Sequence, residues 1–390
     1  MASTLIPNTQ KKISSNVDDR IRLVGLGRNE ILFHLENFGI EKQKLKMRTK
    51  QIFHWIYNYG VRDWSEMTNI AKKLRNELEE KFSLERPKII EKQVSNDGTR
   101  KYLIQMSPGV EVETVFIPDV SKTGALCVSS QVGCTLTCKF CHTGTQKLVR
   151  NLTSQEIVLQ VISARDDLNE WPTTQENRKL TNIVFMGMGE PLLNFDSVTP
   201  AIALMMDDNA YNLSKRRVTL STAGVVPAID RLSQITDVSL AISLHAPNDL
   251  LRNELVPVNQ KYNIDALLDA CNRYLENLTD KRVITMEYTM IDGVNDQPKH
   301  ARELAQVLKR VPCKLNLIPF NPFPGSDYRR SPRPQIEAFQ RIMAKSGIIT
   351  TIRSTRGDDI DAACGQLVGQ VKDRTRRSAA HAARIEAKQI

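Results

Sequence analysis

Three cysteines fall within a stretch of eight residues in the segment GCTLTCKFCHTG, which spans residues 133–144. They are Cys134, Cys138 and Cys141, spaced C-x3-C-x2-C. Clustered thiolates hold zinc or an iron–sulfur cluster, and structural zinc usually takes four ligands in two separated pairs. His142 as a fourth zinc ligand is disfavoured, because adjacent residues rarely reach one metal ion together. A four-iron cluster on three thiolates leaves one iron open to a substrate or cofactor.

From Ala125 onward, each unusual motif directly follows an apolar, β-branched run that predicts a strand. The motifs are the cysteine loop after ALCVSSQV, GMGEP after TNIVFM, STAG after RVTL, SLHAPN after VSLAI, and NPFPG after LNLIPF. In a βα barrel or an open α/β sheet, the carboxyl edge of the strands carries the active site. We therefore expect these five motifs to meet at one edge.

The elements that position these motifs alternate between strands and helices from Ala125 onward. Amphipathic stretches between the apolar runs predict helices over residues 153–167, 196–206, 228–234, 264–278, 298–310 and 334–345. This alternation predicts a parallel sheet of six or seven strands, either open and doubly wound or a partial barrel. Ahead of it, TRKYLIQM and VEVETVFI flank SPG and predict a β-hairpin.

The first 95 residues or so predict a small module of three amphipathic helices. Between the first two helices, EKQKLKMRTK predicts a basic loop. Its cations are Lys42, Lys44, Lys46, Arg48 and Lys50. Such a loop suits RNA phosphates, although a packing or dimerisation module fits the same pattern.

The chain carries 54 Lys and Arg against 44 Asp and Glu, for a net charge of +10. This favours a polyanionic partner such as nucleic acid, although a merely basic enzyme fits equally well. The N-terminus lacks an apolar signal core, and no apolar run approaches ~18–20 residues. We therefore expect a cytoplasmic protein with no membrane contact and reduced thiols. The basic tail after Gln370 predicts a frayed helix or a disordered arm.

The cysteine spacing, with Phe140 just before the third cysteine, resembles the signature of the radical S-adenosylmethionine superfamily. GMGEP is similar to the superfamily's glycine-rich motif, in which Glu190 would help to hold the methionine ammonium group. The ordered set VETVFIPD, CVSSQVGC, GMGEPLLN, STAG, SLHAPND, EYTMIDGVND, NLIPFNPFPG and DIDAACGQL resembles the bacterial dual-specificity RNA (adenine-C2) methyltransferases. The match covers about residues 109–367, with one departure at Lys147, where the family often has glycine.

The resemblance implies an α/β fold, a partial (βα)6 TIM-like barrel of the radical S-adenosylmethionine type with an N-terminal helical domain and a β extension. It divides the chain into residues 1–95, an RNA-binding helical domain, and residues 96–124, a strand pair. Residues 125–355 would form the core, and residues 356–390 a segment with the methyl-carrier cysteine and the basic tail.

The implied activity is methylation of C2 of one adenosine in 23S rRNA and of the adenosine 3′ to the anticodon in some tRNAs. C2 lies between two ring nitrogens and is electron-poor, so polar methyl transfer fails there and a radical route is needed. The implied cofactors are one [4Fe–4S] cluster on the three loop cysteines and two molecules of S-adenosyl-L-methionine per turnover. Flavodoxin and its reductase would donate electrons, and the protein would act as a monomer.

The resemblance also assigns roles to individual residues. Cys364 would become S-methylcysteine, and a carbon radical formed on that methyl group would add to C2. Glu113 would accept the C2 proton, and Cys127 would attack the sulfur of Cys364 and leave a transient disulfide. The expected S-adenosylmethionine contacts are Gly189, Glu190, Ser221, Ser243, Leu244, His245 and Asn321.

Two other functions stay open on the sequence. The first is C8-methylation of the same rRNA adenosine, which confers antibiotic resistance and uses the same fold and cysteines. The second is a non-catalytic RNA-binding protein whose iron–sulfur cluster is structural or senses redox state. Taken without the resemblance, Cys127 reads as a core residue and Glu113 as an ordinary strand carboxylate.

Overall fold

One ten-stranded sheet forms the centre of the computed structural model, which describes residues 19–120 and 123–367. Seven strands are parallel: β6 (Gly124–Cys127), β9 (Leu180–Phe185), β10 (Val218–Thr222), β11 (Ser239–Ser243), β12 (Ile284–Met290), β13 (Cys313–Pro319) and β14 (Thr350–Ile352). Three antiparallel strands extend the sheet beyond β6: β5 (Val110–Pro118), β4 (Arg100–Ser107) and β3 (Lys88–Val94). The basic tail expected after Gln370 lies outside the described residues.

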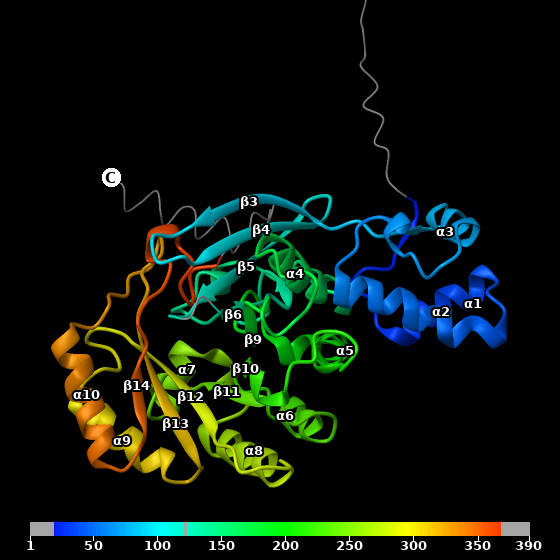
Figure 1. The fold of residues 1–390 in the computed structure, drawn as a ribbon. Helices are drawn as coiled ribbons and strands as arrows, with labels where there is room; N and C mark the ends of the chain where they lie inside the picture. Colours follow the sequence, from blue (N-terminus) through cyan, green and yellow to red (C-terminus); the bar gives the residue numbers. More distant parts are fainter. Residues whose placement is uncertain (1–18, 121–122, 368–390) are drawn as a thin grey trace, which may run out of the picture.

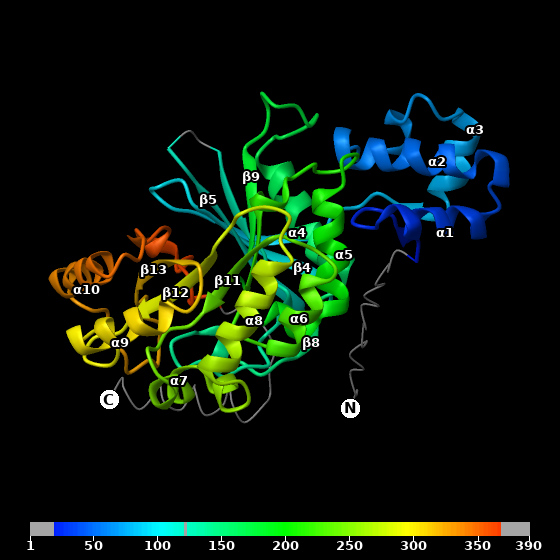
Figure 2. The same cartoon turned by 90° about the horizontal axis from the view of Figure 1, so that it is seen from below.

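Helices cover the outer face of the curved parallel strands (Figures 1 and 2). They are α4 (Ser154–Asp167), α5 (Phe195–Met206), α6 (Val226–Ser233), α8 (Ile264–Glu276), α9 (Pro298–Leu308) and α10 (Arg333–Lys345). The short α7 (Asp249–Leu255) lies instead at the carboxyl ends of β10 and β11. Strand residues alternate between the two faces. On β13, Leu315 and Leu317 are fully buried, whereas Asn316 lies between them on the other face and bonds the Glu287 side chain. The expected α/β partial barrel is confirmed.

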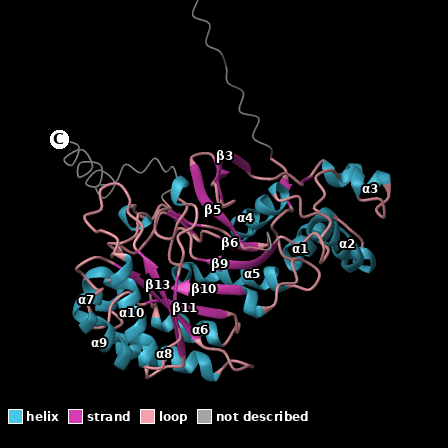
Figure 3. Ribbon diagram, turned by 60° about the vertical axis from the view of Figure 1, so that its left-hand side comes forward, coloured by secondary structure: helices cyan, strands magenta, loops and turns pink. Residues whose placement is uncertain are grey.

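The N-terminal module contains α1 (Arg28–Phe38), α2 (Lys42–His54) and α3 (Lys72–Glu79), which lie together on one side of the barrel (Figures 1 and 3). The predicted basic loop is wrong, because Lys42 begins helix α2. The apolar spacing continues through the lysines, so that Leu45, Ile52 and Phe53 are buried on one face. The cations are therefore carried by a helix rather than by a loop.

Strand β3 and helix α7 were not expected from the sequence. β3 (KIIEKQV) is the edge strand, and most of its side chains are exposed, so it shows no apolar run. β3 forms because it pairs with the antiparallel strand β4, from Lys88 opposite Gln105 to Val94 opposite Arg100. Helix α7 has only seven residues and begins where the Asn248 side chain accepts a hydrogen bond from the Leu251 N–H.

Candidate active site

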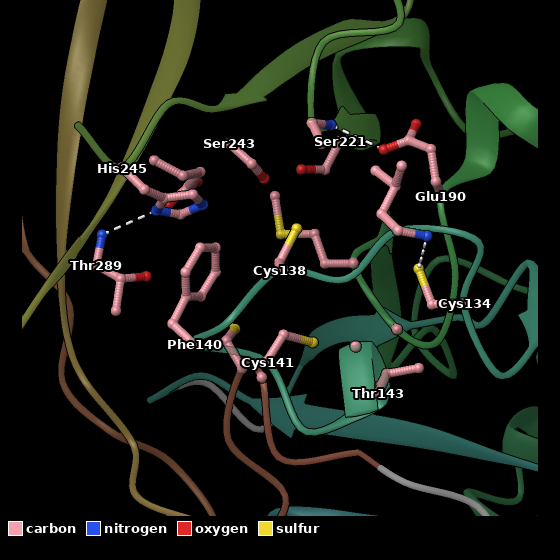
Figure 4. Close-up of a pocket in the computed structure, with 18 of the residues that line it drawn as sticks. Cys134, Cys138, Phe140, Cys141, Thr143, Glu190, Ser221, Ser243, His245 and Thr289 are labelled. Carbon is pink, nitrogen blue, oxygen red and sulfur yellow. Dashed lines mark hydrogen bonds between the residues drawn. The ribbon is translucent and has the colours of Figure 1, made fainter. Parts of the chain in front are cut away.

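The cysteine loop leaves the carboxyl edge of the sheet and folds back tightly on itself. A side-chain carbon at Gly133 would lie 2.2 Å from the Lys147 carbonyl oxygen, and one at Gly144 would lie 2.6 Å from that of Cys138. Only glycine permits such close backbone approach. Cys134, Cys138 and Cys141 all line one cavity, where Figure 4 shows them opposite side chains from several strand ends.

The three thiols fit an iron–sulfur cluster better than a single metal ion. Burial raises the pKa of Cys138 well above its usual range, and the neighbouring thiols of Cys141 and Cys134 raise it further. Thiolates therefore need a cationic partner here, which bound iron supplies. Within residues 19–120 and 123–367, no three His, Cys, Asp or Glu side chains are placed to hold one metal ion. A cluster does not require that, because each thiolate binds a different iron.

His142 is directed away from the role of zinc ligand. Its ring stacks on Phe323, with the ring centroids 4.9 Å apart and the planes within 10°. Its Nδ1 lies 3.3 Å from the Gln366 carbonyl oxygen. The ring thus packs between the cysteine loop and the C-terminal segment and does not line the cavity.

Glu190 presents a buried carboxylate to the cavity. Its Oε1 accepts a hydrogen bond from the Leu192 N–H (3.0 Å) and its Oε2 accepts one from the Ala223 N–H (2.8 Å). Burial raises its pKa above the usual value. Gly189 makes the turn possible, because its φ is +99° and a side-chain carbon would lie 2.5 Å from Gln131 Cβ. This fixed acid beside a glycine turn fits the ammonium group of an amino acid.

His245 follows β11 and contributes a neutral imidazole. The Thr289 N–H donates to its Nδ1 at 3.0 Å, so Nε2 carries the proton. Burial, with the nearby Arg252 cation, lowers its pKa to about 3. Phe140 of the cysteine loop packs on its ring at 4.3 Å between centroids.

The predicted hydroxyl donors also meet here. Ser221 and Ser243, from the ends of β10 and β11, line the cavity with His245 and Glu190, as Figure 4 shows. Leu244 differs, because its side chain is fully buried in the core and does not line the cavity. Its N–H donates to the Glu287 carbonyl at 3.1 Å.

Cys364 lies in the same cavity as the three loop cysteines, although more than 220 residues separate them in sequence. The Asn321 side-chain amide donates to the Cys364 carbonyl at 3.0 Å. The His142 N–H donates to the Gly365 carbonyl at 2.6 Å. The C-terminal segment is thereby tied both to the end of β13 and to the cysteine loop.

Comparison with known proteins gives this constellation a family. Residues 128–305 match the radical SAM superfamily, and residues 21–84 match the ribosomal RNA large subunit methyltransferase N-terminal domain. The dual-specificity RNA methyltransferase RlmN of Marinobacter nauticus is 55% identical over 360 residues, covering 92% of this chain and 96% of that protein. The protein of the same name from Caulobacter sp. is 52% identical over 378 residues, which cover 97% of this chain and 93% of that protein.

A crystal structure of a radical SAM methyltransferase from Sphaerobacter thermophilus has the same fold. It aligns with a TM-score of 0.81 at 41% identity and covers 89% of this chain and 99% of that one. The chain belongs to the dual-specificity RNA methyltransferase family. It is a radical S-adenosylmethionine RNA methyltransferase, and membership of the superfamily implies a [4Fe–4S] cluster and S-adenosylmethionine.

In this methyltransferase Cys127 lies at the end of β6, close to Cys364. Burial raises the pKa of Cys127 to about 12, and the Cys364 thiol contributes to that rise. All seven cysteines are free in the structure. Cys271 and Cys313, which serve packing, lie on α8 and β13.

Arg353 and Glu287 are cavity residues that sequence reasoning missed. The Cys364 thiol raises the pKa of Arg353, and Glu287 and Cys127 do so as well, which places one guanidinium among these three groups. Glu287 is 4% exposed, and its Oε2 has no hydrogen-bond partner within the described ranges. A lone carboxylate inside the otherwise uncharged strand ITMEYTM was the available signal for Glu287.

Glu113 lies on β5 and does not line the cysteine cavity. Its Oε1 is 3.6 Å from Lys101 Nζ on β4. Glu113 shares a sheet face with Val115, which is paired in register with Cys127. The structure thus places Glu113 on the face that also carries Cys127, one strand away from it.

No helix in the described part of the chain has the length and apolar character to cross a membrane.

Proposed function

We propose that the protein methylates C2 of one adenosine in 23S rRNA and of the adenosine 3′ to the anticodon in some tRNAs. The observation that carries this proposal is the shared cavity of Cys364 with Cys134, Cys138 and Cys141. A methyl-carrying thiol beside a radical-generating site is the arrangement that an electron-poor carbon requires. The family relationship supports RNA as the substrate.

The cofactors would be held by the residues that already converge on the cavity. Cys134, Cys138 and Cys141 would ligate the cluster, and Glu190 would bind the ammonium group of S-adenosylmethionine. Ser221, Ser243, His245, Asn321 and the backbone at Gly189 and Leu244 would hold the rest of that molecule. When bound, the pair supplies a 5′-deoxyadenosyl radical, and two molecules of S-adenosylmethionine are used per turnover.

The chain's own residues would then carry the methyl group. The Cys364 thiolate accepts a methyl group on Sγ, and one hydrogen atom is later removed from that methyl group. The resulting carbon radical would bond to C2 of adenine, Glu113 would take the C2 proton, and the one electron left over would pass to the bound cluster. Cys127 attacks the sulfur of Cys364, and the S–C bond breaks. The released carbon keeps the electron pair and gains a proton, which leaves a methyl group on RNA and a Cys127–Cys364 disulfide.

RNA would contact the cations on α2, so its affinity should fall with salt. Lys42, Lys44 and Lys46 are exposed on this helix. Each lysine that contacts a phosphate releases a counterion, so each contact adds to the salt dependence of RNA binding. The protein would act as a cytoplasmic monomer that receives electrons from flavodoxin and its reductase. The target base must be flipped out or unstacked to reach the cavity.

An anaerobic turnover tests the proposal. The protein is reconstituted with iron and sulfide and incubated with reductant, S-adenosylmethionine and a 23S rRNA fragment, and the digested RNA is analysed by mass spectrometry. We expect 2-methyladenosine, which Cys364→Ala abolishes. 8-Methyladenosine would assign the C8 activity instead, and RNA binding without cleavage of S-adenosylmethionine would indicate a binding protein.

A further inference from the structure

Lys101 on β4 bridges two parts of the molecule that the proposed reaction needs to bring together. Its Nζ is 3.6 Å from Glu113 Oε1 on the neighbouring strand β5. The same Nζ donates to the Asp361 carbonyl at 3.4 Å. Asp361 lies three residues before Cys364, in the C-terminal segment. One ammonium group therefore touches both the expected base and the segment that carries the methyl-accepting thiol.

Strand alternation separates Lys101 from its neighbours on β4, Arg100 and Tyr102. Arg100 and Tyr102 bond Asp167 of α4, so they point toward the helical face of the sheet. Lys101 points to the opposite face, where it is level with Val115 and, one strand further, with Cys127. The cation thus belongs to the side of the sheet where Cys127 and the C-terminal segment lie.

The Lys101–Glu113 pair is sheltered from solvent. Only 13% of the Lys101 side chain and 10% of the Glu113 side chain are exposed. A pair in such surroundings is screened less by water and salt than a surface pair. It can therefore fix the direction of the carboxylate more firmly than an exposed ion pair would.

We propose that Lys101 is a positioning residue that aims the Glu113 carboxylate at the adenine held by the Cys364 segment. This inference rests on the proposed function. The proton that leaves C2 goes to a Glu113 oxygen, and Lys101 takes no part in the proton transfer. Its task is to set the place of the base relative to the carrier segment, because proton transfer needs hydrogen-bond reach.

The test separates the half-reactions in single turnovers of the reconstituted, full-length protein with an RNA fragment. Methylation of Cys364 is followed by peptide mass, the covalent protein–RNA adduct on denaturing gels, and 2-methyladenosine by mass spectrometry. In Lys101→Met we expect Cys364 methylation within about twofold of wild type, while release of 2-methyladenosine slows about tenfold or more and adduct accumulates. Glu113→Gln should give the same pattern more strongly.

Two further variants keep the outcome decisive. Lys101→Gln retains a donor to the Asp361 carbonyl without the charge and should also accumulate adduct, even if Lys101→Met folds poorly. Lys101→Arg retains the charge and should restore release. Lys92→Met is the matched control, because Lys92 on the adjacent strand β3 pairs with Asp167 at 2.7 Å on the helical face. It should behave as wild type.

Wild-type release in both Lys101→Gln and Lys101→Met would overturn the inference. An equal fall in Cys364 methylation and in release would also overturn it, because that result describes a fold defect. Absence of 2-methyladenosine from the wild-type reaction would instead overturn the proposed function, on which the inference depends.

Discussion

Backbone hydrogen bonds within the cysteine loop hold one wall of the cavity, whereas the wall that carries Cys364 is held to the rest of the protein largely by side chains, with one backbone bond from the His142 N–H to the Gly365 carbonyl. In the first wall the Cys141 N–H donates to the Cys138 carbonyl, and the Gly144 N–H donates to that of Cys141. In the second wall Asn321, Lys101 and the Gln366 side chain make the anchoring contacts. A backbone-held wall depends on glycines and turns, and a side-chain-held wall depends on residues distant in sequence.

This difference suits the two tasks. A cluster site has to be rigid, because the three thiolates must keep a fixed geometry around the irons. The carrier segment has to present Cys364 to a methyl donor, then to adenine and then to Cys127. Side-chain anchors can be exchanged one at a time during such a cycle, whereas a backbone turn cannot.

The largest effect is expected from Gly144→Ala. The added carbon would meet the Cys138 carbonyl oxygen at 2.6 Å, so the loop would open and the cluster would be lost. We expect loss of bound iron and of all RNA methylation, measured by iron assay and turnover. Gly27→Ala is the control, because its added carbon meets only the end of the flexible Glu30 side chain, at 3.4 Å. Normal iron content in Gly144→Ala would contradict a backbone-shaped cluster wall.

Glu190→Gln should have the next largest effect. The change removes the negative charge and leaves one acceptor oxygen, so only one of the contacts from the Leu192 and Ala223 N–H groups can remain. Loss of one charge-assisted hydrogen bond weakens S-adenosylmethionine binding about 10- to 100-fold. Isothermal titration of the reconstituted protein measures this, with iron content expected to stay unchanged. Unaltered affinity would remove Glu190 from the amino acid site.

Asn321→Ala probes the other wall and should have a smaller effect. It removes the amide that donates to the Cys364 carbonyl and accepts from Arg330. We expect Cys364 methylation to slow about 5- to 10-fold, the worth of roughly one hydrogen bond, while iron content stays normal. Peptide mass after incubation with S-adenosylmethionine reports the rate. Iron loss in this variant would show that the two walls are not independent.

The cluster wall could be predicted from the sequence, because its residues are local. The C-x3-C-x2-C spacing, the GMGEP turn and the strand-end serines all sit next to the elements that place them. The carrier wall could not be predicted in the same way. Nothing in TRKYLIQM shows that Lys101 meets Asp361, because the contact spans 260 residues. Likewise, the sequence predicts a loop over the first part of α2, because the lysines there hide Leu45, which continues the buried stripe of Ile52 and Phe53.

The smallest effect is expected on the pH dependence of stability, through His245, whose Nδ1 accepts a hydrogen bond from the Thr289 N–H. The folded protein keeps this imidazole neutral down to a pKa of about 3, whereas an unfolded histidine binds a proton near pH 6.5. Between those values the unfolded state binds more protons, so the free energy of unfolding falls as pH drops, by at most about 1.4 kcal/mol per pH unit.

Denaturant unfolding of the wild type and of His245→Gln between pH 7 and pH 4 measures how much His245 contributes to the pH dependence of the free energy of unfolding. The variant should lose stability less steeply on acidification, although its stability at pH 7 is lower because the Thr289 N–H loses its partner. His54→Gln, at an exposed position on α2, is the control for replacing a histidine outside the cavity. Equal slopes for wild type and His245→Gln would mean that the ring takes up its proton in the folded state. The backbone contact at Nδ1 would then be too weak to exclude it, and the comparison of the two walls would fail at this residue.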